Sequence, residues 1–287
     1  MEAENKWDGL DASASKANDT AALQAQYADA GNFRARMVLN KRFSRNKQGW
    51  NRWIFERMLQ NSPLREGSRV LELGCGPGYL WKMNADRLPQ GAAILLSDFS
   101  GGMLDAARRV LGAAAAGFAF KIIDAERIPE PDGAFDVVLA SLMLYHVPDR
   151  RRAIGEMRRV LREDGVLYVT TIGSRNMIEL VRLFRDCFGL ADHPGHSVAG
   201  KFGLENGMAQ LREQFGSVEL LRYEDALEVT EAAPLLDYLL STKGITPTAA
   251  SLTPERIATF QAYLEALIKR DGKISITKDS GLFIARK

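Results

Sequence analysis

The chain contains few cysteines and no apolar run long enough to cross a membrane. Only two cysteines, Cys75 and Cys187, occur in 287 residues, which excludes a disulfide framework and a zinc-ligand cluster. The longest apolar stretch, residues 135–147, is interrupted by an acid, a serine and a histidine, whereas a membrane helix needs about 18 uncharged apolar residues. The first twenty residues also lack the apolar core of a signal peptide. We therefore expect a cytoplasmic protein without a bound metal.

Phosphate-binding motifs are missing as well, and the charge is nearly balanced. No G-x-x-x-x-G-K-[ST] sequence occurs, and a net charge of +2 gives no general preference for nucleic acid. Basic residues do gather between residues 34 and 57, with Phe43, Trp50 and Trp53 among them. Such a segment could bind RNA, form a solvated helical face, or cap a cofactor cleft with Asn46 near the carboxylate of the cofactor. We favour the cap.

Strand-like and helix-like segments alternate after residue 68. The strand candidates are 69–73, 93–97, 118–123, 135–140 and 165–171, and the helix candidates between them are 79–88, 101–112 and 149–162. This alternation predicts an α/β fold with a doubly wound, mostly parallel sheet of seven strands. In such sheets the ligand lies at the carboxyl ends of the strands.

Four regions are expected along the chain. Residues 1–18 form a disordered tail, 19–62 an N-terminal helical cap, 63–190 the cofactor-binding core, and 191–287 the part that completes the sheet. In that last part, 218–229 and 281–286 are predicted to pair as an antiparallel hairpin. The helical patterns between them, 232–242 and 254–270, would then be an insertion, and we expect residues 232–271 to act as a lid.

A glycine-rich loop follows the first predicted strand in the sequence VLELGCGPGY. Gly74, Gly76 and Gly78 allow the backbone to approach a ligand closely. Their G-x-G-x-G spacing differs from the G-x-G-x-x-G of dinucleotide sites. Glu72 would also repel a pyrophosphate, and it favours a ligand that carries positive charge. The loop therefore indicates S-adenosylmethionine (SAM) rather than NAD. The alternative for this loop taken alone is an ordinary tight turn between a strand and a helix.

Acidic residues end the next two predicted strands. Asp98, 24 residues after Gly74, could accept hydrogen bonds from both ribose hydroxyls of a nucleoside, or it could cap the following helix. Asp124, Ala125 and Glu126 end the third strand and could meet the amino edge of adenine. The alternative there is a plain turn.

The fourth predicted strand ends at Ser141 to His146, where the reacting groups would meet. His146 and Tyr145 are the candidate general bases for a hydroxyl acceptor. The alternative for His146 is a packing role. An amine acceptor would need only alignment. For His193 and His196 in a later loop we favour simple surface exposure.

Four segments together carry a family resemblance: VLELGCGPG, LLSDFSGGMLDAAR, IIDAERIPEPDGAFDVVLASLMLYHVPD and AIGEMRRVLREDGVLYVTT. They cover about residues 68–172, and in this order they resemble class I SAM-dependent methyltransferases of the small-molecule type, close to the ubiquinone- and biotin-pathway group. The resemblance implies that the methionine and ribose parts of SAM are lined by Glu72, Gly74, Cys75, Gly76 and Gly78. It also implies ribose binding by Asp98, adenine contacts from Phe99, Met103, Asp124, Ala125 and Glu126, and the Ser141 backbone near the sulfonium.

The predicted function is methyl transfer from SAM to an oxygen or nitrogen of a small metabolite, with S-adenosyl-L-homocysteine as the product. The N/D-P-P-Y/F sequence of amide and adenine-amine methylation is absent, since SLML stands in its place. An RNA methyltransferase and a SAM-binding protein without catalysis remain the alternatives. We expect no nucleic acid or membrane partner, and the sequence allows a homodimer.

Overall fold

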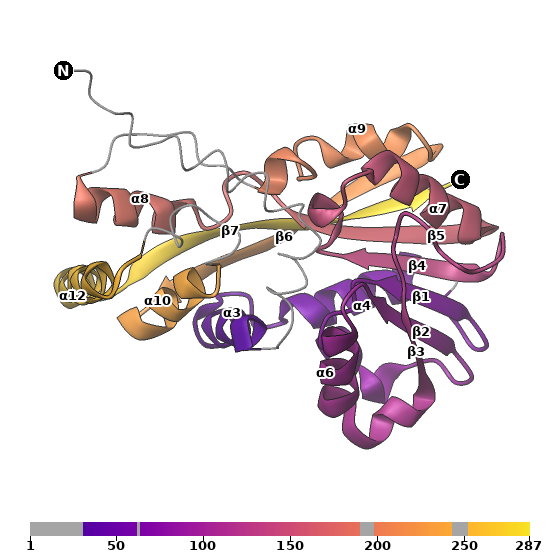
Figure 1. Ribbon diagram of the computed structural model, residues 1–287, viewed down its shortest axis with the longest axis horizontal. Coiled ribbons are helices and arrows are strands. Elements are labelled where there is room, and N and C mark those ends of the chain that lie inside the picture. Colours follow the sequence, from indigo (N-terminus) through magenta and orange to yellow (C-terminus); the bar gives the residue numbers. More distant parts are fainter. Residues whose placement is uncertain (1–30, 62–63, 190–197, 243–251) are drawn as a thin grey trace.

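The computed structural model describes residues 31–61, 64–189, 198–242 and 252–287. The expectations for the tail, for the start of the helical cap, and for His193 and His196 lie outside these residues. A seven-stranded sheet in the order β3-β2-β1-β4-β5-β7-β6 forms the centre of the molecule (Figure 1), which confirms the predicted fold class. Its strands are β1 Arg69–Leu73, β2 Ala93–Asp98, β3 Phe118–Ile122, β4 Phe135–Ser141, β5 Leu161–Ile172, β6 Ser217–Val229 and β7 Ile274–Arg286.

The first five strands are parallel, and β7 runs antiparallel between β5 and β6. The predicted antiparallel hairpin is confirmed, but β7 begins at Ile274, seven residues earlier than expected. β5 begins at Leu161 instead of residue 165, because Leu161 already pairs with Phe135 before the register with β4 shifts.

Helices cover both faces of the sheet. They are α3 Gly31–Phe43, α4 Trp50–Asn61, α5 Tyr79–Lys82, α6 Gly101–Leu111, α7 Arg150–Val160, α8 Ile178–Phe188, α9 Gly207–Arg212, α10 Ala232–Leu240 and α12 Pro254–Asp271, with the short 3-10 helices η1 Ala85–Arg87, η2 Gly112–Gly117, η3 Leu144–His146 and η4 Val198–Gly200. The predicted helix at 79–88 is divided into α5 and η1. Asn84 between them is fully buried and donates its side-chain amide to the carbonyl oxygen of Leu80 at 2.7 Å.

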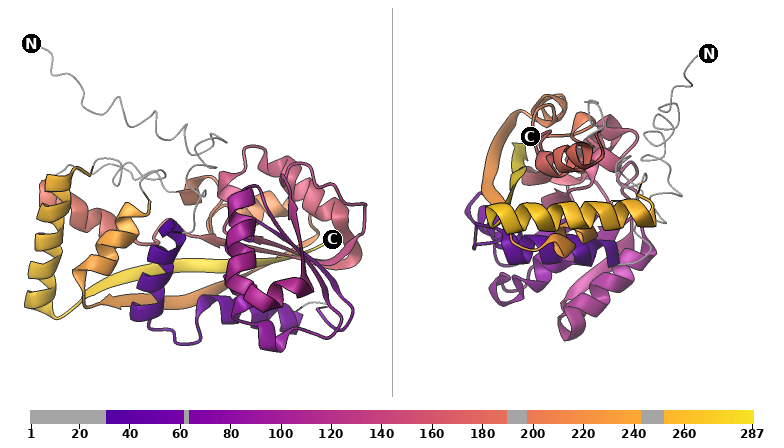
Figure 2. Two further views of the ribbon diagram at one scale, coloured as in Figure 1. Left: turned by 60° about the horizontal axis from the view of Figure 1, so that its bottom comes forward. Right: turned by 90° about the vertical axis from the view of Figure 1, so that its left-hand side faces the viewer.

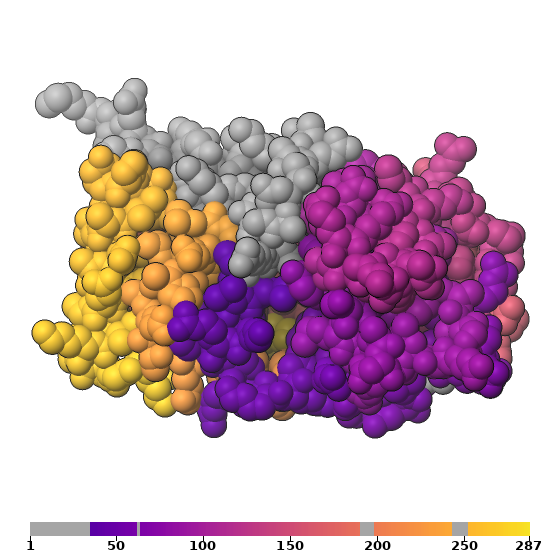
Figure 3. Space-filling model, turned by 90° about the horizontal axis from the view of Figure 1, so that it is seen from below, coloured from indigo at the N-terminus to yellow at the C-terminus, as the bar shows by residue number. Residues whose placement is uncertain are grey.

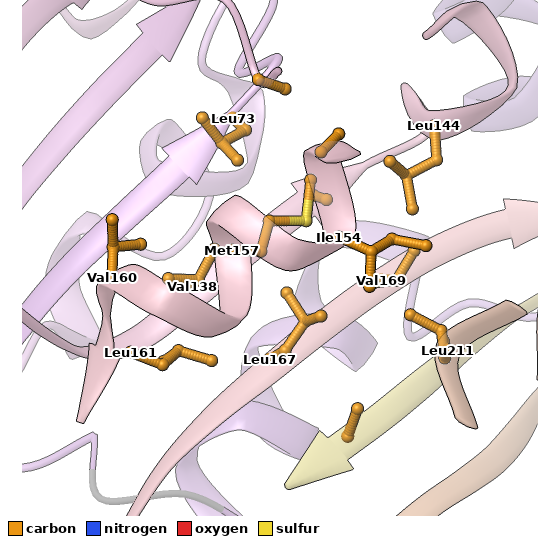
Figure 4. Packing of buried hydrophobic residues seen from close by; sticks show 14 of the residues in the cluster. Leu73, Val138, Leu144, Ile154, Met157, Val160, Leu161, Leu167, Val169 and Leu211 are labelled. Carbon is orange, nitrogen blue, oxygen red and sulfur yellow. The ribbon is translucent and has the colours of Figure 1, made fainter. Parts of the chain in front are cut away.

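Two hydrophobic clusters fill the space between the sheet and its helices. On one face, α7 buries Ala153, Ile154, Met157 and Val160 against β4 and β5 (Figure 4). This spacing is the apolar stripe of an amphipathic helix, so the arginines of α7 lie toward solvent. On the other face, α4, α5 and α6 supply Phe55, Trp81 and Leu104. These clusters hold the carboxyl ends of the parallel strands at one edge.

A third cluster lies beyond that edge, where β6 and β7 continue past the parallel strands as a two-stranded ribbon. Figure 2 shows both strands running from the core to α12 at the far end of the molecule. Leu227 and Ile276 of the ribbon pack there with Leu39 of α3, Leu235 of α10 and Phe260 of α12. The insertion between β6 and β7 therefore folds around the ribbon with its own apolar core.

The third cluster and the elements around it, α3, α10, α12 and the far ends of β6 and β7, form what we call the outer part. A hollow opens between this outer part and the sheet core. Figure 3 shows α3 (indigo) on one side of the hollow, the purple residues of the core on the other, and β7 (yellow) at its floor. We call it the strand-end cleft. α10 packs against α3, and α12 packs against α10. Whether residues 232–271 act as a lid over the cleft stays a prediction.

Candidate functional site

Three glycines of the loop after β1 have left-handed backbone conformations for different reasons. Their φ angles are 68° at Gly74, 51° at Gly76 and 71° at Gly78. A Cβ at Gly74 would lie 2.9 Å from Cβ of Met143, and one at Gly78 would lie 3.3 Å from Cβ of Ala107. A Cβ at Gly76 would meet nothing within 4 Å. Gly74 and Gly78 thus permit close packing, whereas Gly76 leaves open space beside the loop.

Asp98 lies next to that space at the end of β2. Its Oδ2 accepts a hydrogen bond from the backbone N–H of Gly76 at 3.0 Å, and its Oδ1 accepts one from the N–H of Ser100 at 2.9 Å. The cap of α6 is Ser100, whose Oγ accepts from the N–H of Met103. Burial raises the pKa of Asp98, and the backbone hydrogen bonds oppose that effect. Asp98 is therefore not the N-cap of α6, and its role in binding ribose stays a prediction.

Glu72 lies beneath the loop with 2% of its surface exposed. Its Oε2 accepts a hydrogen bond from Nε1 of Trp81 at 2.5 Å. Burial raises the pKa of Glu72 to about 8, and the charge of Asp98 adds to this, while the Trp81 hydrogen bond opposes it. In the free protein the carboxyl is therefore mostly protonated at neutral pH. A cationic ligand in the cleft would favour its ionised form.

This raised pKa makes the stability of the free protein depend on pH. Between about pH 4.5 and pH 8 the folded protein keeps a proton on Glu72 that the unfolded chain has released, so stability falls as the pH rises through this range. We expect Glu72→Gln to remove that contribution. The melting temperature of the variant, relative to that of the wild type, should therefore rise between pH 6 and pH 9. Thermal denaturation across this range measures the difference, and parallel curves for the two proteins would contradict it.

Two large apolar side chains are exposed at the ends of β2 and β3. Phe99 is 43% exposed and Ile122 is 62% exposed, and Ile122 pairs in register with Asp98. Exposed apolar side chains beside an acid that is predicted to bind ribose would suit a flat base. The side chain of Met103, by contrast, is 2% exposed and belongs to the core. The sequence did not indicate Ile122 as a site residue, because an isoleucine in a strand is normally expected to be buried in the core.

The turn after β3 is tied to α7. Oδ1 of Asp124 accepts a hydrogen bond from the N–H of Glu126 at 2.9 Å, and Oε1 of Glu126 accepts one from the N–H of Asp149 at 2.8 Å. The side chain of Ala125 is buried in the core, while that of Asp124 is exposed. These hydrogen bonds connect the turn after β3 to the start of α7.

The end of β4 carries backbone strain. Leu142 has φ 51°, a conformation that branched residues rarely adopt. Its N–H donates to Oγ1 of Thr170 at 3.0 Å, and Oγ of Ser141 lies 3.4 Å from the same oxygen. Strained residues held by side-chain hydrogen bonds gather at functional sites. Thr170, buried in β5, was not foreseen, since only the tertiary fold brings it to Ser141.

Tyr145 and His146 follow in η3. Both side chains are partly buried, and their ring centroids lie 4.6 Å apart in an edge-to-face arrangement. They therefore lie at the carboxyl edge of the sheet, one turn beyond Ser141.

The basic N-terminal segment makes contacts within the molecule. Arg36 donates to Ser241, and Arg42 and Arg45 pair with Glu231 and Glu228 of the outer part. Phe43 and Trp53 are buried. These arrangements disfavour RNA binding. The side-chain amide of Asn46 donates to the carbonyl oxygen of Glu224, so Asn46 is directed to the edge of β6 and does not fit the role of contacting a cofactor carboxylate.

Metal-ligand clusters and membrane-spanning helices are both absent from the described residues. Within these ranges no group of three or more His, Cys, Asp or Glu side chains is arranged to hold a metal ion. The helices of the same ranges include none with the length and apolar character of a membrane span.

Comparisons with known proteins agree with this geometry. Residues 71–169 match the family described as "Methyltransferase domain". The chain is 31% identical to a malonyl-[acyl-carrier protein] O-methyltransferase of Geobacter sulfurreducens over 71% of this chain and 75% of the relative. It is also 31% identical to a demethylmenaquinone methyltransferase of Thermus thermophilus over 60% of this chain and 77% of the relative. Some other relatives match over only about half of their own length.

Solved structures support the fold. A putative methyltransferase from Bacillus halodurans superposes with a TM-score of 0.53 and 17% identity, and the match covers 81% of this chain and 97% of the other. At this identity the likeness concerns the fold alone. Together with the family match and the Geobacter relative, it shows that the chain belongs to the class I SAM-dependent methyltransferases.

Proposed function

We propose that this protein transfers the methyl group of SAM to an oxygen or nitrogen atom of a small-molecule acceptor in the strand-end cleft. The observation that carries the proposal is the open space at Gly76 beside the Asp98 carboxylate. Phe99 and Ile122 extend this space with exposed apolar surface. This donor and acceptor set fits a nucleoside with a cationic tail, so the residues present fit SAM.

Each residue of the site has a proposed role. SAM supplies a methyl group that its sulfonium already activates. Asp98 would accept hydrogen bonds from the ribose hydroxyls, and Gly76 would admit the ligand to the loop backbone. Glu72 would offset the positive charge, and the Ser141 backbone would border the sulfonium. The protein then mainly aligns the acceptor with the methyl group.

Calorimetry with SAM, S-adenosyl-L-homocysteine and NAD tests the cofactor assignment. We expect binding of the first two and none of NAD. A protein that bound NAD and neither SAM nor its product would refute the proposal.

The relatives indicate where to look for the acceptor. One of them is named for a malonyl thioester of acyl carrier protein and another for demethylmenaquinone. We therefore propose a panel of carboxylates, phenols and amines, assayed with SAM that is isotopically labelled in its methyl group. Under this proposal α3 and α4 cap the cleft, the insertion 232–271 borders its acceptor side, and no nucleic acid takes part.

We further propose His146 as the general base for a hydroxyl acceptor, with the ring of Tyr145 edge-to-face against it. Positioned general bases contribute about 10²–10⁴-fold, so His146→Gln should lower kcat at least about 100-fold. The affinity for S-adenosyl-L-homocysteine should not change. A pH–rate profile that keeps its acidic limb in His146→Gln would exclude this role. Tyr145→Phe serves as the matched test of the neighbouring hydroxyl.

A further inference from the structure

One face of the β6–β7 ribbon carries an acid and a base at opposed positions of the two strands. Asp225 of β6 lies opposite Lys278 of β7 in the antiparallel ladder. Oδ2 of Asp225 accepts a hydrogen bond from Oγ of Ser44 at 2.7 Å, and Oδ1 accepts one from the N–H of Asn46 at 2.9 Å. Side chains of directly opposed residues project to the same face of a sheet. Lys278 therefore projects to the face that α3, α4 and their connecting loop cover.

Lys278 interrupts a row of otherwise buried side chains on one face of β7. The residues of β7 that share its face are buried on both sides of it: Ile274, Ile276, Ser280, Leu282 and Ile284. The side chain of Lys278 is only partly buried. β7 forms the floor of the strand-end cleft (Figure 3), and Lys278 is the residue of this row whose side chain is left partly exposed.

The charge of Lys278 is poorly compensated. Within the described residues its ammonium group has no hydrogen bond and no ion pair, with Asp225 or any other acid. Both oxygens of Asp225 already accept hydrogen bonds, including a second one at Oδ1 from the N–H of Ala226. Burial lowers the pKa of Lys278 to about 8, and the charge of Asp225 opposes that effect. A desolvated ammonium without a partner is stabilised by an incoming anion.

The distance from Lys278 to the proposed position of the methyl donor indicates how long the acceptor must be. Ser141, at the proposed sulfonium position, pairs with Thr170, and Thr170 pairs with Leu282. Lys278 lies four residues beyond Leu282 along β7, about 13 Å at the rise of a strand, and β7 lies two strand spacings, about 10 Å, from β4. The backbone at Lys278 is therefore about 16 Å from that at Ser141. A group bound by Lys278 would therefore belong to the end of the acceptor that is remote from the methylated atom.

We propose that Lys278 binds a carboxylate of the methyl acceptor and so selects acidic acceptors of about this length. The inference rests on the proposed function. A singly charged group fits better than a phosphate, because Asp225 lies opposite Lys278 and would repel a second negative charge. Lys278 is in this view a specificity-determining residue that takes no part in the transfer itself.

The test is calorimetry with protein that is saturated with S-adenosyl-L-homocysteine. The probes are cinnamate, 4-phenylbutyrate and octanoate, each compared with its primary amide. We expect at least one acid to bind the wild type 10-fold or more tightly than its amide. Lys278→Met should bind acid and amide equally, and Lys278→Arg should keep most of the preference. Lys273→Met is the matched control, because Lys273 is an exposed lysine just before β7 that pairs with Glu228.

Equal binding of every acid and amide to the wild type would overturn the proposal, as would a preference that persists in Lys278→Met. If the variant fails to fold, NMR of the wild type with ¹³C-methylated lysines decides. The acid must raise the pKa of Lys278 and the amide must not. Failure of the wild type to bind S-adenosyl-L-homocysteine would instead count against the proposed function, so the two failures are distinguishable.

Discussion

Replacing Asp98 by alanine should weaken the binding of SAM and of its product by about 1–3 kcal/mol, which is roughly 5- to 150-fold. The carboxylate would lose two charged hydrogen bonds to the ribose. It would also lose its bonds to the N–H groups of Gly76 and Ser100, which hold the loop against β2. Calorimetry with S-adenosyl-L-homocysteine measures the loss directly, without any need for the acceptor.

Asp105→Ala provides the control for this variant. Asp105 is an exposed acid of α6 that pairs only with Arg108, three residues on, at 2.9 Å. Its removal alters the net charge by the same amount and should leave the affinity unchanged. If Asp98→Ala bound the product as tightly as Asp105→Ala does, the ribose assignment would be wrong.

A second large loss of affinity for SAM and its product is expected from Gly76→Ala. A methyl group at this position would enter the open space that we assign to SAM, at a cost of about 1–3 kcal/mol, as in overpacked sites. That corresponds to roughly 5- to 150-fold weaker binding. The left-handed φ of 51° adds backbone strain of about 1–2 kcal/mol to the folded state.

Gly133→Ala separates the two contributions. Gly133 also has a left-handed φ, 62°, and a Cβ there would likewise meet nothing within 4 Å, but it precedes β4 at the opposite edge of the sheet. Both variants should lose similar stability in thermal denaturation, and only Gly76→Ala should lose affinity for S-adenosyl-L-homocysteine. Equal affinities would mean that no ligand occupies the space at Gly76.

Features that depend on neighbours in sequence were the ones that could be predicted. The apolar runs of β1, β2 and β4 and the glycines after β1 are local patterns, and they predicted the strands and the loop where the structure has them. The cofactor site at this edge stays a prediction. The start of β7 was missed because Lys278, Asp279 and Ser280 interrupt its apolar alternation, although the strand continues through them.

Burial and contact between distant segments could not be read from the chain. The sequence presents three similar glycines, yet their different roles depend on Met143 and Ala107, which lie far along the chain. The core position of Met103 and the exposure of Ile122 likewise depend on packing around them. The acceptor side of the cleft combines α3 with the ribbon, whose residues are separated by almost the whole chain.

The ribbon also determines how the outer part can move. β6 and β7 pair without a break from Ser217 and Arg286 to Val229 and Ile274, so the same two strands belong to the core and to the outer cluster. Along these strands the described residues offer no loop about which a rigid rotation could occur. Widening the cleft must therefore bend a hydrogen-bonded ladder along its length. Hydrogen exchange of the ladder amides near Asp225 in β6 and near Ser280 in β7 would report that bending.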